Sequence, residues 1–561
     1  MRALLPLVSL LLAWSEGTRA SDPTLPFMEY LDEGHLVCLK WGFDNLKEEI
    51  TFKLVVNSTG WVSFGLSPSG GMAGSDIVMG GLDSGTSYFT DRHATGNSMP
   101  KVDEQQSYTL LSMAEEEGQT IMAFKRPFQT CDDQDLPITA QPIKLIYAYG
   151  ITDEIGYHGA HRGTKEVNLL NYEQRTMLTN SDYITIKMDN ITLPPTTTSY
   201  YCKIMTLPRF TTKHHIYMTE PIIENHDVVH HMVLYRCPPS VTEPYEGDCS
   251  KSQSGIYCLG VVASWAVGGR PFELPGNAGI SIGGMGNDTL YKLEIHYNNP
   301  AKRPGITDSS GLKLYYTSQL RQHDVGILTT GVLSLGGLQY SIPPKAKQFH
   351  TYGICKTAHF SQFVKPVPNL EVFAVLLHTH LAGRKVRVGH FRNGKLVDFL
   401  GLNENYDFEM QQIVTLGSIK TIQPGDEITV ECTYNTEDRI EDTKDEMCLA
   451  FLFYYPEIKI ANCISHPNTS MISVNEEPTG ESDQDEIAEH EMLLKTLPQI
   501  QIVSDDNSTV NIFTDSVGIV NEMMKTPAAA CKITNASNRL RAFWIVNYAG
   551  IVLLLTRIGI L

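Results

Sequence analysis

One pair of histidines in this chain has a spacing that suits metal binding. His378 and His380 are separated by a single residue. Because alternate side chains of a β-strand point to the same face, both imidazoles can bind one ion. The spacing therefore favours a metal site on one face of a strand.

A second pair, His230 and His231, is adjacent in the sequence. In an ideal strand, neighbouring side chains point to opposite faces, so both can bind one ion only if the backbone twists or the rings bracket the metal. Another adjacent pair, His214 and His215, is more simply interpreted as exposed or core histidines. Adjacency alone is therefore weak support for a site, and the neighbouring residues must decide.

Four strings around these histidines resemble the signatures of the copper type II, ascorbate-dependent monooxygenases. They are HHMVLYRC at 230–237, LEIHYNNP at 293–300, VFAVLLHTHLAG at 372–383 and DEMC at 445–448. The resemblance covers residues 200–463 densely and is closest to the dopamine beta-hydroxylase-like monooxygenases.

The resemblance implies two separate copper sites and a catalytic role for three of the six ligands. The first site would comprise His230, His231 and His296, and the second, catalytic site would comprise His378, His380 and Met447. Three imidazoles suit a copper that passes electrons, whereas a soft thioether favours Cu(I), the form that binds dioxygen. The implied reaction is hydroxylation of a C–H bond, with ascorbate as the electron donor. No motif identifies an ascorbate site.

The same resemblance implies four disulfides beside the ligands. They are Cys202–Cys249, Cys237–Cys258, Cys355–Cys463 and Cys432–Cys448. Three of the 11 cysteines remain, Cys38, Cys131 and Cys531. A bridge between Cys131 and Cys531 would leave Cys38 as the odd residue.

Two departures from the family pattern bear on activity. Glu371 stands where the signature usually has a further histidine, and we interpret this as a change behind the copper ligands that could retune the site. Only seven residues separate Arg439 from Met447, where relatives have a longer, glycine-containing loop. A shortened loop could misplace Met447. The alternative function is therefore a catalytically inactive extracellular or membrane glycoprotein that keeps the fold and partial copper binding.

Three apolar residues narrow the substrate. In peptide-amidating relatives, an Arg, an Asn and a Tyr bind the substrate carboxylate. Leu376, Leu449 and Phe451 occupy those places here, and apolar side chains cannot compensate a buried carboxylate. The sequence thus disfavours peptide amidation and predicts a small-molecule substrate, with an amine as one candidate.

The fold is expected to be mainly β, with a DOMON-like β-sandwich followed by a two-part, jelly-roll-like copper monooxygenase core. Residues 50, 52, 54 and 56 alternate as in a half-buried strand, and GWVSFGL at 60–66 with GSDIVMG at 74–80 resembles the DOMON domain. Some DOMON domains hold haem, so Met72 or Met79 could be axial ligands, but core packing is the commoner role. The expected segments are a signal peptide at 1–20, the DOMON-like domain at 27–150, the N-terminal and C-terminal monooxygenase subdomains at 198–325 and 340–500, and a hydrophobic anchor at 542–561.

Targeting features predict a secretory-pathway glycoprotein, membrane-anchored or secreted. The first 20 residues have a basic start, an apolar run and small residues before position 21. Six sequons agree with lumenal exposure, at Asn57, Asn190, Asn287, Asn468, Asn507 and Asn535. The apolar stretch at 542–561 predicts a single-pass anchor, with a cleaved lipid-anchor signal or a buried C-terminal core segment as the alternatives.

Charge gives two further expectations. The net charge of −19 argues against nucleic-acid binding. Much acidic charge lies at 476–491, which we expect to be a solvated loop or linker. The sequence is compatible with an oligomer but does not specify one.

Overall fold

The computed structural model describes residues 25–523 with gaps. The gaps are residues 33, 45, 140–142, 171–181, 253–257, 268, 270, 285–288, 333–341, 409–410, 442, 444–445, 468–483, 497, 506–507, 513–519 and 521–522. Two compact units make up the chain. The first comprises the chain up to Ser67, Gly71–Pro137 and Leu145–Lys165, and the second comprises Pro68–Gly70, Ile138–Lys144 and the chain from Glu166 onward.

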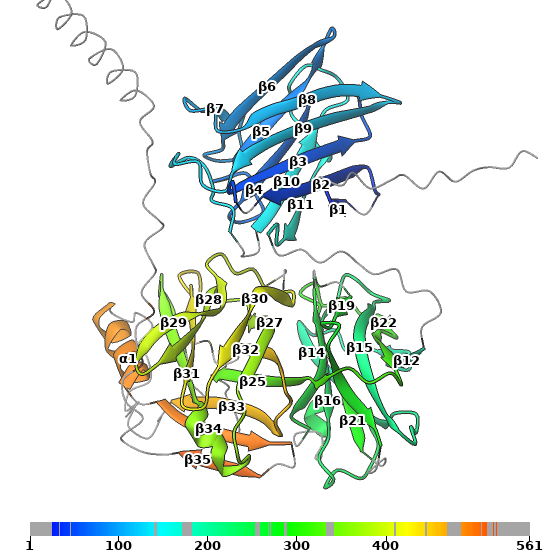
Figure 1. Ribbon diagram of the computed structural model, residues 1–561, viewed down its shortest axis with the longest axis vertical. Helices are drawn as coiled ribbons and strands as arrows, with labels where there is room; N and C mark the ends of the chain where they lie inside the picture. Colours follow the sequence, from blue (N-terminus) through cyan, green and yellow to red (C-terminus); the bar gives the residue numbers. More distant parts are fainter. Residues whose placement is uncertain are drawn as a thin grey trace, which may run out of the picture. The chain divides into compact units, whose positions relative to one another are not determined.

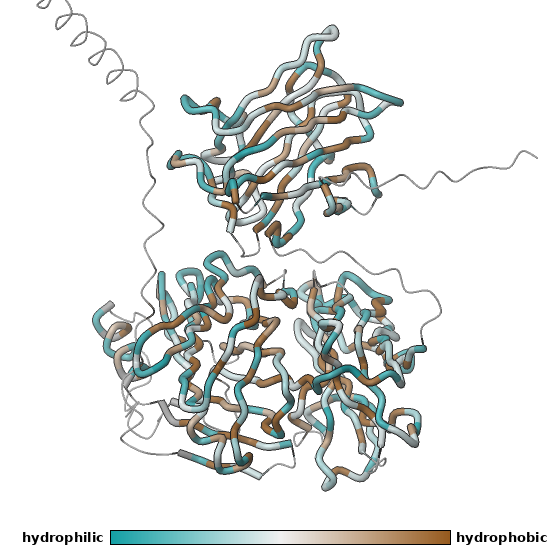
Figure 2. The backbone as a smooth tube through the Cα atoms, in the orientation of Figure 1, coloured by the Kyte–Doolittle hydropathy of each residue, from teal (hydrophilic) through white to brown (hydrophobic). Residues whose placement is uncertain are grey.

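The first unit is a β-sandwich (Figure 1). One sheet has the order β1 (Phe27–Tyr30), β2 (Val37–Asp44), β3 (Glu49–Val56), β9 (Gln119–Pro127), β8 (Thr109–Glu116). The other has the order β11 (Arg162–Val167), β10 (Ile143–Tyr149), β4 (Val62–Ser67), β5 (Asp76–Asp83), β6 (Thr86–His93), β7 (Lys101–Val102). The alternation predicted for β3 is confirmed, because Ile50, Phe52, Leu54 and Val56 are all buried. Figure 2 shows hydrophobic and hydrophilic residues alternating along the strands of this unit.

The second unit begins with another sandwich. One sheet has the order β12 (Tyr183–Lys187), β23 (Gly311–Thr317), β15 (Lys213–Ile222), β20 (Ala278–Gly283), β24 (His323–Asp324), with β19 (Phe272–Glu273) paired to β15. The facing sheet has the order β17 (Tyr245–Asp248), β14 (Thr198–Thr206), β21 (Leu290–Asn298), β16 (Val229–Arg236), β18 (Gly260–Ala266), and β13 (Ile191–Thr192) pairs with β22 (Thr307–Asp308). A short 3-10 helix, η1, covers Cys249–Lys251. Because β12 and β13 already belong here, this sandwich starts before residue 198.

A third sandwich completes the second unit. Its larger sheet has the order β30 (Val414–Ile422), β27 (Leu370–Thr379), β32 (Cys448–Tyr455), β25 (Gly326–Val332), β33 (Ile460–Pro467), β34 (Pro498–Ser504), β35 (Thr509–Ile512). Its smaller sheet has the order β26 (Phe349–Lys356), β31 (Glu427–Tyr434), β28 (Gly383–Arg392), β29 (Lys395–Asn403), and a 3-10 helix, η3, covers Thr357–Gln362. Asn393 and Gly394 form the turn that joins β28 to β29, with φ values of 52° and 73°.

The larger sheet of this third sandwich is buried on both faces. One face, with Val375, Leu377 and Leu452, belongs to the core shared with β26 and β31. The other, with Leu376 and Phe451, belongs to a core that it shares with the preceding sandwich. One continuous apolar cluster therefore joins the two monooxygenase subdomains, and the histidines lie along it.

The prediction of a solvated loop at 476–491 is wrong in its second half. Helix α1 covers Gln484–Thr496. Ile487 and Leu494, seven residues apart and so on one helix face, are buried. Glu491 also accepts hydrogen bonds from the backbone N–H and the Nδ1–H of His350 in β26. Packing against β26 thus stabilises a helix whose acidic composition alone suggests a loop.

Candidate metal centre

A β-bulge brings His230 and His231 together. Along β16, Val229 pairs with Tyr297 of β21, and the next paired residues are His231 and His296. His230 is thus an extra residue in the ladder, and such a bulge re-aims side chains. The two Nδ1 atoms lie 3.3 Å apart. The backbone distortion that adjacent ligands require is therefore present.

His296 completes the first set from the neighbouring strand. It lies directly opposite His231, and the ring centroids are 4.7 Å apart. On its other side Tyr200 of β14 stacks on the His296 ring at 4.5 Å. One ring nitrogen from each of His230, His231 and His296 can be chosen so that all three lie within 4.8 Å of one another. Three neutral imidazoles at this separation fit a single copper ion.

Burial keeps these imidazoles available to a metal. Desolvation lowers the pKa of His230 to about 4 and the pKa of His296 to about 2, and it lowers the pKa of His231 well below its usual range. Among the described residues, neither ring nitrogen of His296 has a hydrogen-bond partner, although the side chain is buried. A buried polar group without a partner is costly. A metal ligand is the role that accounts for it.

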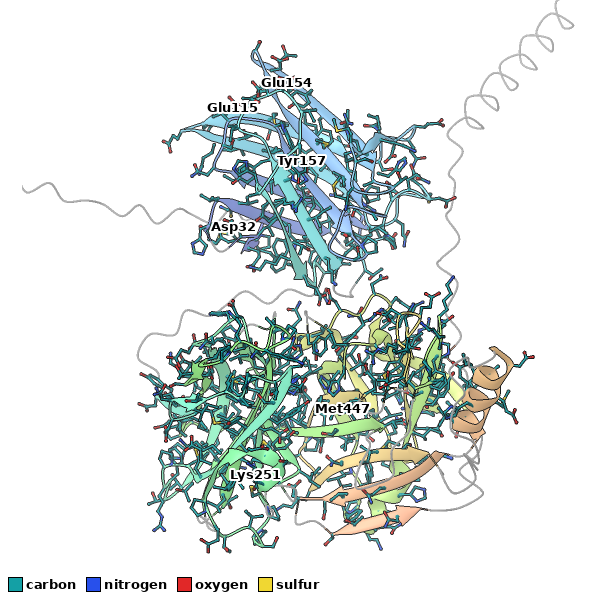
Figure 3. All side chains as sticks on the ribbon, turned by 180° about the vertical axis from the view of Figure 1, so that it is seen from behind. Asp32, Glu115, Glu154, Tyr157, Lys251 and Met447 are labelled. Carbon is teal, nitrogen blue, oxygen red and sulfur yellow. A yellow bond between two sulfur atoms is a disulfide. The ribbon has the colours of Figure 1, made fainter. Side chains whose placement is uncertain are left out.

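The second set lies where β27 ends and β32 begins. His378 pairs with Leu449, and Thr379 pairs with Cys448. β27 ends at Thr379 and β32 begins at Cys448, so His380 and Met447 are the next residues along this register. Because side chains alternate, His378, His380 and Met447 share one face of the sheet. Figure 3 labels Met447 in this unit, where green and yellow strands meet.

His378 of the second set is buried, whereas His380 and Met447 are half-buried, and the strands that carry them are fixed. The rings of His378 and His380 are 5.2 Å apart, and desolvation lowers the pKa of His378 to about 3. Glu446, directly before Met447, accepts hydrogen bonds from the backbone N–H groups of His380 and Ala382 at 2.8 and 2.6 Å. Cys448, directly after it, is bridged to Cys432. Met447 is thus held on both sides despite the short connection from Arg439.

The two sets of ligands lie next to each other. The ring centroids of His231 and His378 are 5.1 Å apart, and those of His296 and His380 are 6.3 Å apart. The core shared by the two subdomains brings the ends of β16, β21 and β27 together, and the binding of two coppers stays a prediction. Five histidines form one cluster.

Two residues that the sequence did not suggest touch this cluster. The Phe408 ring stacks on His230 at 3.9 Å, and its carbonyl accepts a hydrogen bond from His230 Nε2 at 3.1 Å. The Gln411 side-chain oxygen lies 2.7 Å from His378 Nδ1. Both residues lie in the segment that follows β29. Phe408 is 178 residues beyond His230 in the sequence. No local sequence signal marks them.

The proposed role of Glu371 is wrong. It lies seven residues before His378 on the same strand, which corresponds to roughly 23 Å at about 3.3 Å per residue. Its carboxylate accepts a hydrogen bond from Thr421 of β30. The histidine-to-glutamate difference therefore does not border the metal ligands.

Leu376, Leu449 and Phe451 form an apolar wall beside the second set. Leu376 pairs with Phe451, and Leu449 pairs with His378, so all three lie on the ligand face of the sheet. Each is buried in the cluster that Met447 borders. The wall contains no charged group that could bind a carboxylate.

The remaining site predictions fall partly within the described residues. The structure contains all four disulfides that the resemblance implied, and Cys131 is also disulfide-bonded. Asn57 and Asn190 are exposed, whereas the other four sequons and Cys531 lie outside the described residues. Met79 is buried and Met72 packs beside it in one apolar cluster, the packing role that is common for methionine.

The signal and anchor segments cannot be compared with the structure. Residues 1–20 and 542–561 lie outside the described part of the chain. Within the described part, none of the helices has the length and apolar character needed to cross a bilayer.

We expect the copper-free protein to lose stability between pH 7 and pH 5.5. The unfolded histidines take up protons near pH 6.5, whereas His230, His296 and His378 do so only near pH 4 or below when folded, so protons favour the unfolded state as the pH falls. Each buried histidine should cost about 1 kcal/mol at about pH 5.5. Thermal unfolding at both pH values measures the loss. An unchanged midpoint would contradict buried, neutral imidazoles.

Comparison with known proteins agrees with a copper site built from these histidines. The sequence profile of the copper type II ascorbate-dependent monooxygenase N-terminal domain matches residues 184–304, that of the C-terminal domain matches 323–476, and that of the DOMON domain matches 33–150. DBH-like monooxygenase protein 2 of Mus musculus is 38% identical over 82% of this chain and 77% of its own length.

Two further relatives have similar coverage. DBH-like monooxygenase protein 1 of Homo sapiens is 37% identical over 82% of this chain and 78% of its own. Dopamine beta-hydroxylase of Homo sapiens is 34% identical over 81% of this chain and 77% of its own. With the histidine cluster, the fold and these similarities in agreement, the chain belongs to the copper type II ascorbate-dependent monooxygenase family.

Proposed function

We propose that this chain hydroxylates a C–H bond of a small molecule with dioxygen, using ascorbate as the electron donor. In the balanced reaction, R–H, O₂, two electrons and two protons give R–OH and water, and one ascorbate supplies both electrons. The observation that carries the proposal is the cluster of five histidines, of which four are buried and His380 is half-buried, with Met447 directly before the strand that pairs with His378. The name of one relative, dopamine beta-hydroxylase, states the same type of reaction, a hydroxylation.

Each part of the cluster has a distinct task in this proposal. Copper, when bound, supplies the one-electron steps and the dioxygen activation that hydroxylation requires. His230, His231 and His296 would hold the copper that passes electrons, and the second set would hold the copper beside the substrate. The 5.1 Å between the rings of His231 and His378 leaves a short path between the two. Burial of His230, His231, His296 and His378 excludes bulk water from these four ligands, whereas His380 and Met447 are half-buried.

The apolar wall supports a substrate without a carboxylate at this position. Leu376, Leu449 and Phe451 offer contact area but no charge, and a carboxylate buried against them would lose its hydration without compensation. Small aromatic or aliphatic amines fit this requirement. Peptides ending in a carboxylate at the reacting residue do not.

A copper and oxygen assay tests the proposal. The reconstituted chain should bind two coppers, and His378→Ala should bind about one, because it removes a ligand from one set only. Oxygen uptake with ascorbate and a panel of small amines should occur in the parent and fall to background in His378→Ala. Less than one copper per chain would contradict the ligand sets.

The same assay separates the enzyme from the alternative, an inactive glycoprotein. A chain that holds two coppers but consumes no oxygen with any reductant and substrate would be such a glycoprotein. The anchoring of Met447 by Glu446 and Cys448 favours the enzyme. The four disulfides support a location in the oxidising secretory pathway.

A further inference from the structure

A chain of hydrogen bonds connects one histidine of each set. Gln411 Nε2 donates to the Phe408 carbonyl oxygen at 2.9 Å. The same oxygen lies 3.1 Å from His230 Nε2, and Gln411 Oε1 lies 2.7 Å from His378 Nδ1. The order is therefore His378, Gln411, Phe408, His230. All four residues are buried.

This chain fixes the protonation pattern of both imidazoles. A carbonyl oxygen only accepts, so His230 Nε2 carries the proton and Nδ1 presents its lone pair toward His231. The Gln411 amide donates through nitrogen to Phe408, so its oxygen faces His378, and His378 Nδ1 must carry a proton. His378 Nε2 then presents the lone pair. Such partners behind a ligand fix its ring orientation and raise its basicity.

Gln411 is itself held by the strand region that carries His230. Its backbone N–H donates to the Val267 carbonyl at 2.9 Å, and the Val267 N–H donates to the His230 carbonyl at 2.8 Å. Val267 directly follows β18, whose Ala266 pairs with His231. A residue of the second monooxygenase subdomain is thus fixed to the first, while its side chain contacts a ligand of its own subdomain.

We propose that Gln411 is a positioning residue for both copper sites, which orients His378 directly and His230 through the Phe408 carbonyl. The inference rests on the proposed copper sites and goes beyond them, because Gln411 belongs to neither ligand set. Its loss should weaken copper binding mainly at the His378 set, about 10- to 100-fold, the usual cost of removing a partner behind a ligand.

Two variants and a neighbouring control test the proposal. Gln411→Leu removes the acceptor for His378 and the donor to Phe408. Gln411→Glu keeps the acceptor and removes the donor. Gln412→Leu is the matched control, because the Gln412 amide donates to Glu166 and has no hydrogen bond to a histidine among the described residues. Copper is the only ligand needed, so binding is measured by competition with a Cu(I) chelator.

The expected result is a loss that is confined to one set. Gln411→Leu should lose one copper per chain at a chelator concentration that leaves two on the parent and on Gln412→Leu. X-ray absorption of the remaining Cu(I) should lack the sulfur signal that Met447 contributes. Gln411→Glu should retain this copper, but the Cu(II) resonance spectrum of the His230 set should change, because a carboxylate oxygen now faces the Phe408 carbonyl.

The outcomes distinguish this inference from the proposed function. A parent that binds no copper would overturn both. A parent with two coppers and a Gln411→Leu variant of equal affinity would overturn the positioning role alone. If Gln411→Leu does not fold, Gln411→Glu decides, and an unchanged spectrum of the His230 set would then reject the link through Phe408.

Discussion

Met447→His is expected to keep two coppers bound and to abolish hydroxylation. Imidazole is a competent copper ligand, but the thioether gives the second set its preference for Cu(I), the state that binds dioxygen. We expect oxygen uptake to fall by about 100-fold or more, since even partners behind a ligand contribute about 10- to 100-fold. Metal analysis and oxygen uptake on the same sample measure the two effects.

The contacts around position 447 should confine the effect of this substitution to the metal site. Glu446 binds the backbone of His380 and Ala382, Cys448 is bridged to Cys432, and the Tyr434 hydroxyl donates to the Met447 carbonyl at 3.1 Å. A new side chain at position 447 should therefore stay in place. Met447→Leu is the companion variant, which supplies no ligand and should lose one copper. Full activity in Met447→His would refute the role of the thioether.

The short connection between Arg439 and Met447 also bears on whether the chain consumes oxygen. If the parent holds two coppers and yet consumes no oxygen, the glycine-containing loop present in relatives would be the first element to restore. The described contacts argue that this restoration is unnecessary, because Arg439 donates to Thr443 and Thr443 forms a bridge with Ile342. The connection is thus tied to the sandwich through Ile342.

The strand pattern and the ligand types could be predicted from the sequence because they depend on local order. Alternation identified β3, and the spacing of His378 and His380 predicted that both rings lie on one face. The motifs added His296 and Met447, which local spacing alone would assign to packing.

The rest depends on contacts between distant residues. Nothing in the sequence near His230 specifies the bulge that re-aims it, because the bulge arises from pairing with β21. Phe408 and Gln411 reach the ligands only after two sandwiches share a core. Helix α1 likewise forms because β26 offers an apolar surface and His350 offers a donor to Glu491. Tertiary packing overrides local composition in each case.

His296→Leu is expected to remove copper from the three-histidine set and yet to stabilise the copper-free protein. Both ring nitrogens of His296 are buried without a hydrogen-bond partner among the described residues. Such groups cost about 1–3 kcal/mol, and an apolar side chain of similar size removes this cost. Because the folded-state pKa of His296 is about 2, the gain should increase as the pH falls from 7 toward 5.5.

A second buried histidine provides the matched control. His390 is as buried as His296, but its Nε2 binds Asp426 at 2.7 Å, so His390→Leu should destabilise the protein by about 2 kcal/mol or more. Denaturant unfolding of the copper-free variants gives the two free-energy changes, and copper analysis gives the stoichiometry. Equal destabilisation by both substitutions would mean that His296 is retained for the fold. A stabilising His296→Leu together with a destabilising His390→Leu would mean that His296 lowers the stability of the copper-free fold and is retained as a metal ligand.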